Sequence, residues 1–250
     1  MRKNDHILSK LFEGLIIISL VNCVYNVIKY CLHFLDNYVI IIPLIIINTV
    51  EYYIYYNYPK DTREIRKTRL SVIHAMVLFI SNLCYINSFI STELWKTPLL
   101  YSVIYNVLDM EHLYFSKIKI RYQLLFHHFI LIVCILPILI PKVHTYIQVH
   151  SGYNMLVANN FLCEITTIPL NLGWILQAQG KQKTLVFNLY VMLTLFLYIP
   201  FRLFLTAYLS YTNLYIETKF KYFQFMLTGL NYYWFSKMLQ KVFITKFGGE

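Results

Sequence analysis

The sequence predicts an all-α fold, a polytopic transmembrane helix bundle with seven or eight spans. Hydrophobic residues make up 58% of the 250 residues and charged residues only 14%, a balance far from that of a water-soluble domain. Apolar runs recur along the chain, and each approaches the roughly 20 residues that a helix needs to cross a membrane. The polar stretches between them are too short to bury a core, so we expect no separate soluble domain.

The apolar runs define eight expected helices. They cover residues 11–35, 38–57, 71–90, 98–116, 124–140, 153–176, 185–209 and 222–239. The run around 130–140 is apolar on every face, unlike the alternating strands of a β-barrel. The first run has features of a signal peptide, but Glu13, Lys29 and the lack of a small-residue cleavage site favour a helix.

Lysine and arginine alternate between the two ends of these helices. Basic residues precede the first helix and follow the second, fourth, sixth and eighth: Arg2, Lys3, Lys10, Lys60, Arg63, Arg66, Lys67, Arg69, Lys117, Lys119, Arg121, Lys181, Lys183, Lys241 and Lys246. The opposite loops hold Lys96, Lys142, Lys219 and Lys221. Because cytosolic loops retain positive charge, eight spans would place both termini in the cytosol. The net charge of +10 is therefore interpreted as a topology signal, and no nucleic-acid partner is expected.

The cysteines do not suggest a metal site or a disulfide framework. All five lie in apolar runs, without paired spacing or neighbouring metal ligands. We therefore expect no bound cofactor and no metal.

Ionisable residues inside the predicted membrane segments are the candidate site. They are His74, Asp109, His127, His128 and Glu164. Each costs several kcal/mol in a bilayer unless it faces a partner or a cavity, so we expect one shared cavity open toward the cytosol.

Other polar residues are weaker candidates. Asn171, Asn231 and Trp234 are expected to line the pocket, or else to bridge helices and to anchor the membrane interface. Arg202 is expected nearer the other leaflet, where it would snorkel or pair with Glu217.

The order of these motifs resembles the TLC domain family, which includes ceramide synthases. The segments that carry the resemblance are RLSVIHAMV, YSVIYNVLDM, LLFHHFILIV, LCEITTIPLNLGWIL, YIPFRLFL and LNYYWFSKM. The resemblance implies a domain of six transmembrane helices at 59–245, preceded by an N-terminal membrane segment of one or two helices at 1–58. It also implies the endoplasmic reticulum or a related intracellular membrane. The abundance of Tyr, Ile, Asn and Lys, with 23 tyrosines, is typical of A+T-rich coding sequence and points to a large DNA virus or a protozoan, so for a viral protein this would be a membrane of the host.

One departure separates the chain from ceramide synthases. The family's synthases carry an Asp-x-x-Asp pattern on the helix after the paired histidines, whereas Glu164 is followed by uncharged residues. The chain thus resembles the branch associated with membrane phospholipid composition.

Two functions remain open from the sequence, both with membrane lipids as partners. The first is a lipid N- or O-acyltransferase with acyl-CoA as co-substrate, in which His127 or His128 is the base. Asp109 or Glu164 would orient that base, and His74 would assist. Adjacent helical residues diverge by about 100°, so one histidine of the pair is expected to play a supporting part. The second function is a non-catalytic lipid-binding protein or regulator of membrane composition.

Overall fold

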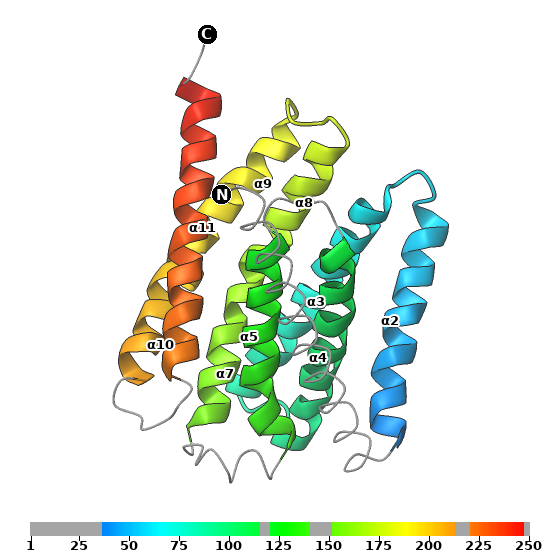
Figure 1. Cartoon of the computed structure of the whole chain (residues 1–250), viewed down its shortest axis with the longest axis vertical. Helices are drawn as coiled ribbons and strands as arrows, with labels where there is room; N and C mark the ends of the chain where they lie inside the picture. Colours follow the sequence, from blue (N-terminus) through cyan, green and yellow to red (C-terminus); the bar gives the residue numbers. More distant parts are fainter. Residues whose placement is uncertain (1–36, 116–120, 141–151, 214–220, 248–250) are drawn as a thin grey trace, which may run out of the picture.

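The computed structural model describes residues 37–115, 121–140, 152–213 and 221–247, and every regular element in these ranges is helical (Figure 1). The elements are α2 (Asn37–Asn57), α3 (Arg63–Ile86), α4 (Thr92–Phe115), α5 (Arg121–Leu139), α7 (Tyr153–Phe161), η1 (Leu162–Thr166), α8 (Thr167–Ala178), α9 (Leu185–Tyr198), η2 (Ile199–Leu205), α10 (Thr206–Asn213) and α11 (Lys221–Phe247). The predicted all-α class is confirmed.

Three of the described helices are long and apolar enough to cross a membrane. They cover Arg63–Ile86, Tyr122–Leu139 and Leu185–Thr212, and they correspond to the third, fifth and seventh predicted helices. The other predicted ranges from residue 38 onward are also largely helical, while the range 11–35 lies outside the described residues. The chain therefore has the character of an integral membrane protein, and the total of seven or eight spans remains a prediction.

Helix α3 begins earlier than its apolar run suggests. The Thr62 side chain accepts a hydrogen bond from the amide of Ile65 at 3.3 Å, which caps the helix start and extends it through the polar segment. His74 therefore lies about 16 Å along the helix at 1.5 Å per residue, not one turn from its start. The apolar run 71–90 alone would place His74 one turn from the start of its helix, and the polar residues 63–70 extend the helix beyond that point.

The bundle places its most basic loops at one end. In Figure 1 the α2–α3 loop, the α8–α9 loop and the last turn of α11 all lie at the top, whereas the α3–α4 turn lies at the bottom. Lys60, Lys181 and Lys183 thus share one end. The helix ends agree with the predicted alternation of basic loops.

The α3–α4 hairpin is fastened at the opposite end by Trp95. This side chain is fully buried, and its Nε1 donates to Oδ1 of Asn82 at 2.9 Å. Its ring stacks on Tyr85 with centroids 4.0 Å apart. Burial of so large a ring together with a satisfied polar group makes this contact a major source of hairpin stability.

Replacing Trp95 by phenylalanine is expected to lower the free energy of unfolding by about 1 to 3 kcal/mol, because Oδ1 of Asn82 loses its donor in a buried place. Thermal unfolding of the purified protein in detergent measures the effect. Trp174→Phe is the matched control, since Trp174 is 38% exposed. The double change Trp95→Phe with Asn82→Leu should regain much of the loss, and an equal loss in the double variant would contradict the assigned role of the hydrogen bond.

Candidate functional site

An aspartate and a histidine meet between α4 and α5 near the basic end of the bundle. Nε2 of His128 lies 3.0 Å from Oδ2 of Asp109, and both side chains are largely buried. Each residue lies about 9 to 11 Å from the end of its helix at 1.5 Å per residue. Antiparallel packing of α4 and α5 thus brings two residues at equal depth together. We call these two residues the Asp–His pair.

One imidazole nitrogen of the Asp–His pair has no hydrogen-bond partner among the described residues. It is Nδ1 of His128, which is buried. When Nε2–H donates to the carboxylate, Nδ1 keeps its lone pair and can accept a proton. A carboxylate that fixes the tautomer and supports the imidazolium is the arrangement of a general base.

His127 points elsewhere, as expected for adjacent residues of a helix. Its ring centroid is 5.7 Å from that of His128, with planes inclined at 54°. It meets the Trp234 ring edge-on at 5.3 Å, and its Nδ1 has no partner among the described residues. His127 lines a cavity of about 40 Å³ together with Glu164, Arg202 and Asn231.

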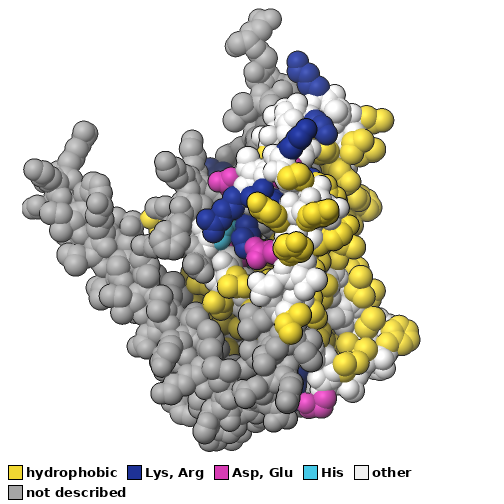
Figure 2. Space-filling model, turned by 90° about the vertical axis from the view of Figure 1, so that its right-hand side faces the viewer, with side chains coloured by type: hydrophobic (Ala, Val, Ile, Leu, Met, Phe, Trp, Pro, Cys, Tyr) yellow, Lys and Arg dark blue, Asp and Glu magenta, His cyan; other side chains and the backbone are white. Residues whose placement is uncertain are grey.

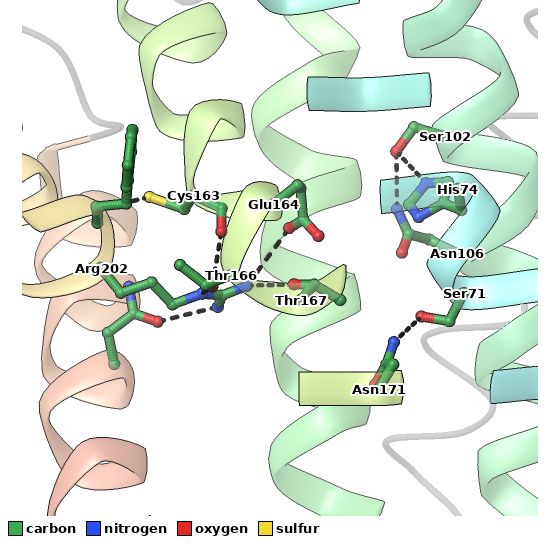
Figure 3. Close-up of polar contacts among 12 residues, drawn as sticks. Ser71, His74, Ser102, Asn106, Cys163, Glu164, Thr166, Thr167, Asn171 and Arg202 are labelled. Carbon is green, nitrogen blue, oxygen red and sulfur yellow. Dashed lines mark hydrogen bonds and ion pairs between the residues drawn. The ribbon is translucent and has the colours of Figure 1, made fainter. Parts of the chain in front are cut away.

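Arg202 is the centre of a buried polar network (Figure 3). Its Nε donates to Thr166 Oγ1 at 2.6 Å and its Nη2 to Thr167 Oγ1 at 2.7 Å. Nη1 donates to Asn231 Oδ1 at 3.2 Å, and Nη2 lies 3.7 Å from Glu164 Oε1. We call these five residues the arginine network.

The arginine network corrects two expectations. Arg202 is only 5% exposed, so the predicted snorkelling is wrong, and its described acidic partner is Glu164. Glu217, the partner considered from the sequence, lies outside the described residues. Glu164 is engaged with Arg202, and among the described residues Asp109 is the acid that contacts one of the paired histidines, His128.

Two irregular helical turns carry this network. Glu164 lies in the 3₁₀ helix η1 and Arg202 in the π-helix η2, where Pro200 lacks an amide donor. Side chains satisfy carbonyls of the π-helix: Cys163 Sγ donates to Phe201 O at 2.9 Å, and Thr206 Oγ1 donates to Arg202 O. Pro200, two residues before an arginine in an apolar run, is the one sequence feature that could have indicated an irregular turn here.

His74 and Asn171 lie in separate contacts between helices. His74 Nε2 lies 3.1 Å from Ser102 Oγ, and the ring stacks on Tyr105 at 3.8 Å. Asn171 Nδ2 donates to Ser71 Oγ at 2.9 Å, which joins α8 to α3. The serines were not identified from the sequence, because a hydroxyl in an apolar run carries little signal.

The expected single cavity is therefore divided. Glu164, His127 and Asn231 line the small cavity, whereas the Asp–His pair and His74 are not among its lining residues. Its volume of about 40 Å³ suits one or two water molecules and is too small for an acyl chain.

The fold and site define a helical membrane protein with a buried carboxylate–imidazole pair. No protein-family model matches the chain, and no curated protein or solved structure is significantly similar to it. Among the described residues, no group of three or more His, Cys, Asp or Glu side chains is placed to hold a metal ion.

Proposed function

We propose that this protein is a multi-pass membrane acyltransferase in which His128 is the general base and Asp109 orients it. The observation that carries the proposal is the 3.0 Å contact between His128 Nε2 and Asp109 Oδ2. Nδ1 of His128 is buried and has no hydrogen-bond partner among the described residues. A histidine takes up and releases protons near neutral pH. A carboxylate is costly to bury at this depth of a membrane bundle, so its presence beside a histidine favours a functional site.

The reaction proposed is transfer from a thioester, such as acyl-CoA, to a lipid amine or hydroxyl. Nδ1 of His128 takes the proton from the nucleophile while the nucleophile attacks the thioester carbonyl. The new C–N or C–O bond forms and the C–S bond breaks. The imidazolium then returns its proton to the departing thiolate, and Asp109 stabilises the transient cation.

The depth of the Asp–His pair suits two substrates from different phases. The pair lies about 9 to 11 Å inside the basic end of the bundle by helical rise, and positive loops favour the cytosolic side. A water-soluble thioester would approach from that side and the lipid from the bilayer. The acyl chain would lie outside the 40 Å³ cavity, with only the reacting groups reaching the histidine.

The arginine network has a structural part in this proposal. Each Arg202 nitrogen already has a partner, so it fastens η1 to η2 and α11. Membership of the TLC domain family and a location in the endoplasmic reticulum stay predictions, and both are compatible with lipid acyl transfer.

The test is lipidomics with isotope-labelled fatty acid in cells that lack ceramide synthases. His128→Ala should abolish the labelled ceramide, or other labelled acyl lipid, that the intact protein makes at matched expression. His112→Gln is the matched control, since His112 lies on α4 and is partly exposed. His127→Ala separates the two histidines and should retain more activity than His128→Ala.

The opposite result would favour the second function considered from the sequence. If no labelled lipid class differs between the intact protein and His128→Ala, the acyltransferase proposal fails. A lipid-binding protein or regulator of membrane composition would then be the better account, since binding needs no proton transfer.

A further inference from the structure

A groove away from the Asp–His pair is lined mainly by charged and aromatic residues that the proposed reaction does not use. It lies between the end of α2 and the start of α3, has a volume of about 520 Å³, and is lined among others by Arg63, Arg66, Lys67, Glu51, Tyr52 and Tyr55. Three cations and one carboxylate give these residues a net charge of +2. Figure 2 views the α2 side of the molecule and shows Lys and Arg side chains gathered in its upper half, with acidic side chains among them. We call this feature the basic groove.

The cations of the basic groove differ in how far they are engaged. Lys67 forms an ion pair with Glu51, and Arg66 donates to the Asp61 carbonyl and lies over the Tyr55 ring at 5.0 Å. Arg63 is exposed and has no partner among the described residues. Glu51 is thus neutralised locally, and the Arg63 guanidinium is available to an anion.

Arg69, farther along α3, does not contribute to the charge of the groove. Its Nε lies 2.7 Å from Asp61 Oδ2, and its guanidinium lies over the Tyr58 ring at 3.8 Å. This arginine is therefore satisfied within the protein and does not line the groove. Among the described residues, Arg63 and Arg66 are the groove cations without an acidic partner. Their planar guanidinium groups match the spacing of phosphate oxygens.

The aromatic residues beside the groove indicate a membrane surface. Tyr52, Tyr53, Tyr55 and Tyr56 on α2 are 60 to 74% exposed, and exposed tyrosines at a helix end are typical of the level of lipid headgroups. Basic residues at that level attract anionic lipids of the cytosolic leaflet. An occupant that joins a phosphate to acyl chains would satisfy both the cations and this apolar border.

We infer that the basic groove binds the phosphate headgroup of an anionic phospholipid of the cytosolic leaflet. The lipid phosphate lies against Arg63 and Arg66, its glycerol region against the tyrosines of α2, and its chains outside the bundle. The groove lies beside the α2–α3 loop, at the end of the bundle where α4 ends and α5 begins (Figure 1), and this end also holds the Asp–His pair. The inference rests on the membrane placement within the proposed function and is independent of acyl transfer.

Native mass spectrometry of the full-length protein in detergent tests this inference, with phosphatidic acid and phosphatidylcholine titrated separately. We expect phosphatidic acid to bind in preference. Arg63→Gln with Arg66→Gln should weaken it about 30-fold, from about fivefold per cation near a membrane surface. Lys181→Gln with Lys183→Gln is the matched control, because it removes the same charge from exposed positions at the same end and should leave binding unchanged.

A single-arginine variant and competition by a soluble phosphate complete the test. Arg63→Gln alone should weaken phosphatidic acid binding about fivefold, and it disturbs no described contact within the protein. Glycerol 3-phosphate, which carries the headgroup without chains, should not displace the lipid at equal concentration. Displacement by glycerol 3-phosphate would overturn the lipid assignment in favour of a soluble phosphate. Equal binding of both phospholipids, or equal affinity in the arginine and lysine variants, would overturn the site itself.

Discussion

Replacing Arg202 by methionine is expected to lower the free energy of unfolding by about 3 to 5 kcal/mol, because it leaves the Glu164 carboxylate buried without its counter-charge. The side chains of Arg202 and Glu164 are only 6% and 9% exposed, so bulk water does not screen the carboxylate that loses its counter-charge. Asn231 Oδ1 loses its donor as well. Chemical or thermal unfolding of the purified protein in one fixed detergent measures the change.

A second variant separates the buried charge from the packing of the arginine side chain. Arg202→Met with Glu164→Gln should regain a large part of the stability, since no unpaired charge then remains in the bundle. Lys96→Met is the matched control: its ion pair with Glu93 at 2.7 Å is exposed, and its loss should cost less than about 1 kcal/mol. If the double variant were as unstable as Arg202→Met, the charge argument would be wrong.

Replacing Asp109 by asparagine is expected to lower the rate of acyl transfer by about 10² to 10⁴-fold. Asparagine occupies the same space but cannot stabilise an imidazolium, and its amide group can hold His128 in the other tautomer. Initial rates with the purified protein in lipid nanodiscs measure the effect. The loss should fall on kcat more than on KM, because Asp109 acts on the base and not on substrate binding.

The control for Asp109 is another carboxylate at the same end of the bundle. Asp61 pairs with Arg69 at 2.7 Å and lies in the α2–α3 loop, so Asp61→Asn should leave the rate unchanged. Asp109→Glu keeps the charge and should retain more activity than Asp109→Asn. Equal rates for Asp109→Asn and the intact protein would remove the reason to assign Asp109 an orienting role.

The helices were predictable from the sequence because membrane spans depend on composition over long windows. Apolar runs from 38–57 to 222–239 all coincide with helical segments, since backbone groups in lipid must be satisfied within a helix. The sequence also selected Asp109 and His128 as candidates, because acids and imidazoles are rare in such runs. Which acid would orient which histidine depended on depth, which the apolar runs fixed only to within a few turns.

The network around Arg202 could not be predicted for a local reason. A π-helix adds a residue to the helical turn and rotates the side chains that follow, so regular periodicity assigns them to the wrong face. Irregular turns at η1 and η2 bring Glu164 and Arg202 together. Composition reveals Pro200 and Arg202 but not the direction in which the arginine points.

Trp95 fixes the two helices of the α3–α4 hairpin to each other at one end. Its ring and its hydrogen bond to Asn82 clamp the two helices at the end farthest from the basic loops. A second contact joins the middle of the same two helices, where His74 of α3 stacks on Tyr105 of α4 at 3.8 Å and lies 3.1 Å from the Ser102 hydroxyl. Any parting of α3 and α4 to admit a substrate would therefore be confined to the ends beyond His74, where Asp109 follows Tyr105 by about one helical turn.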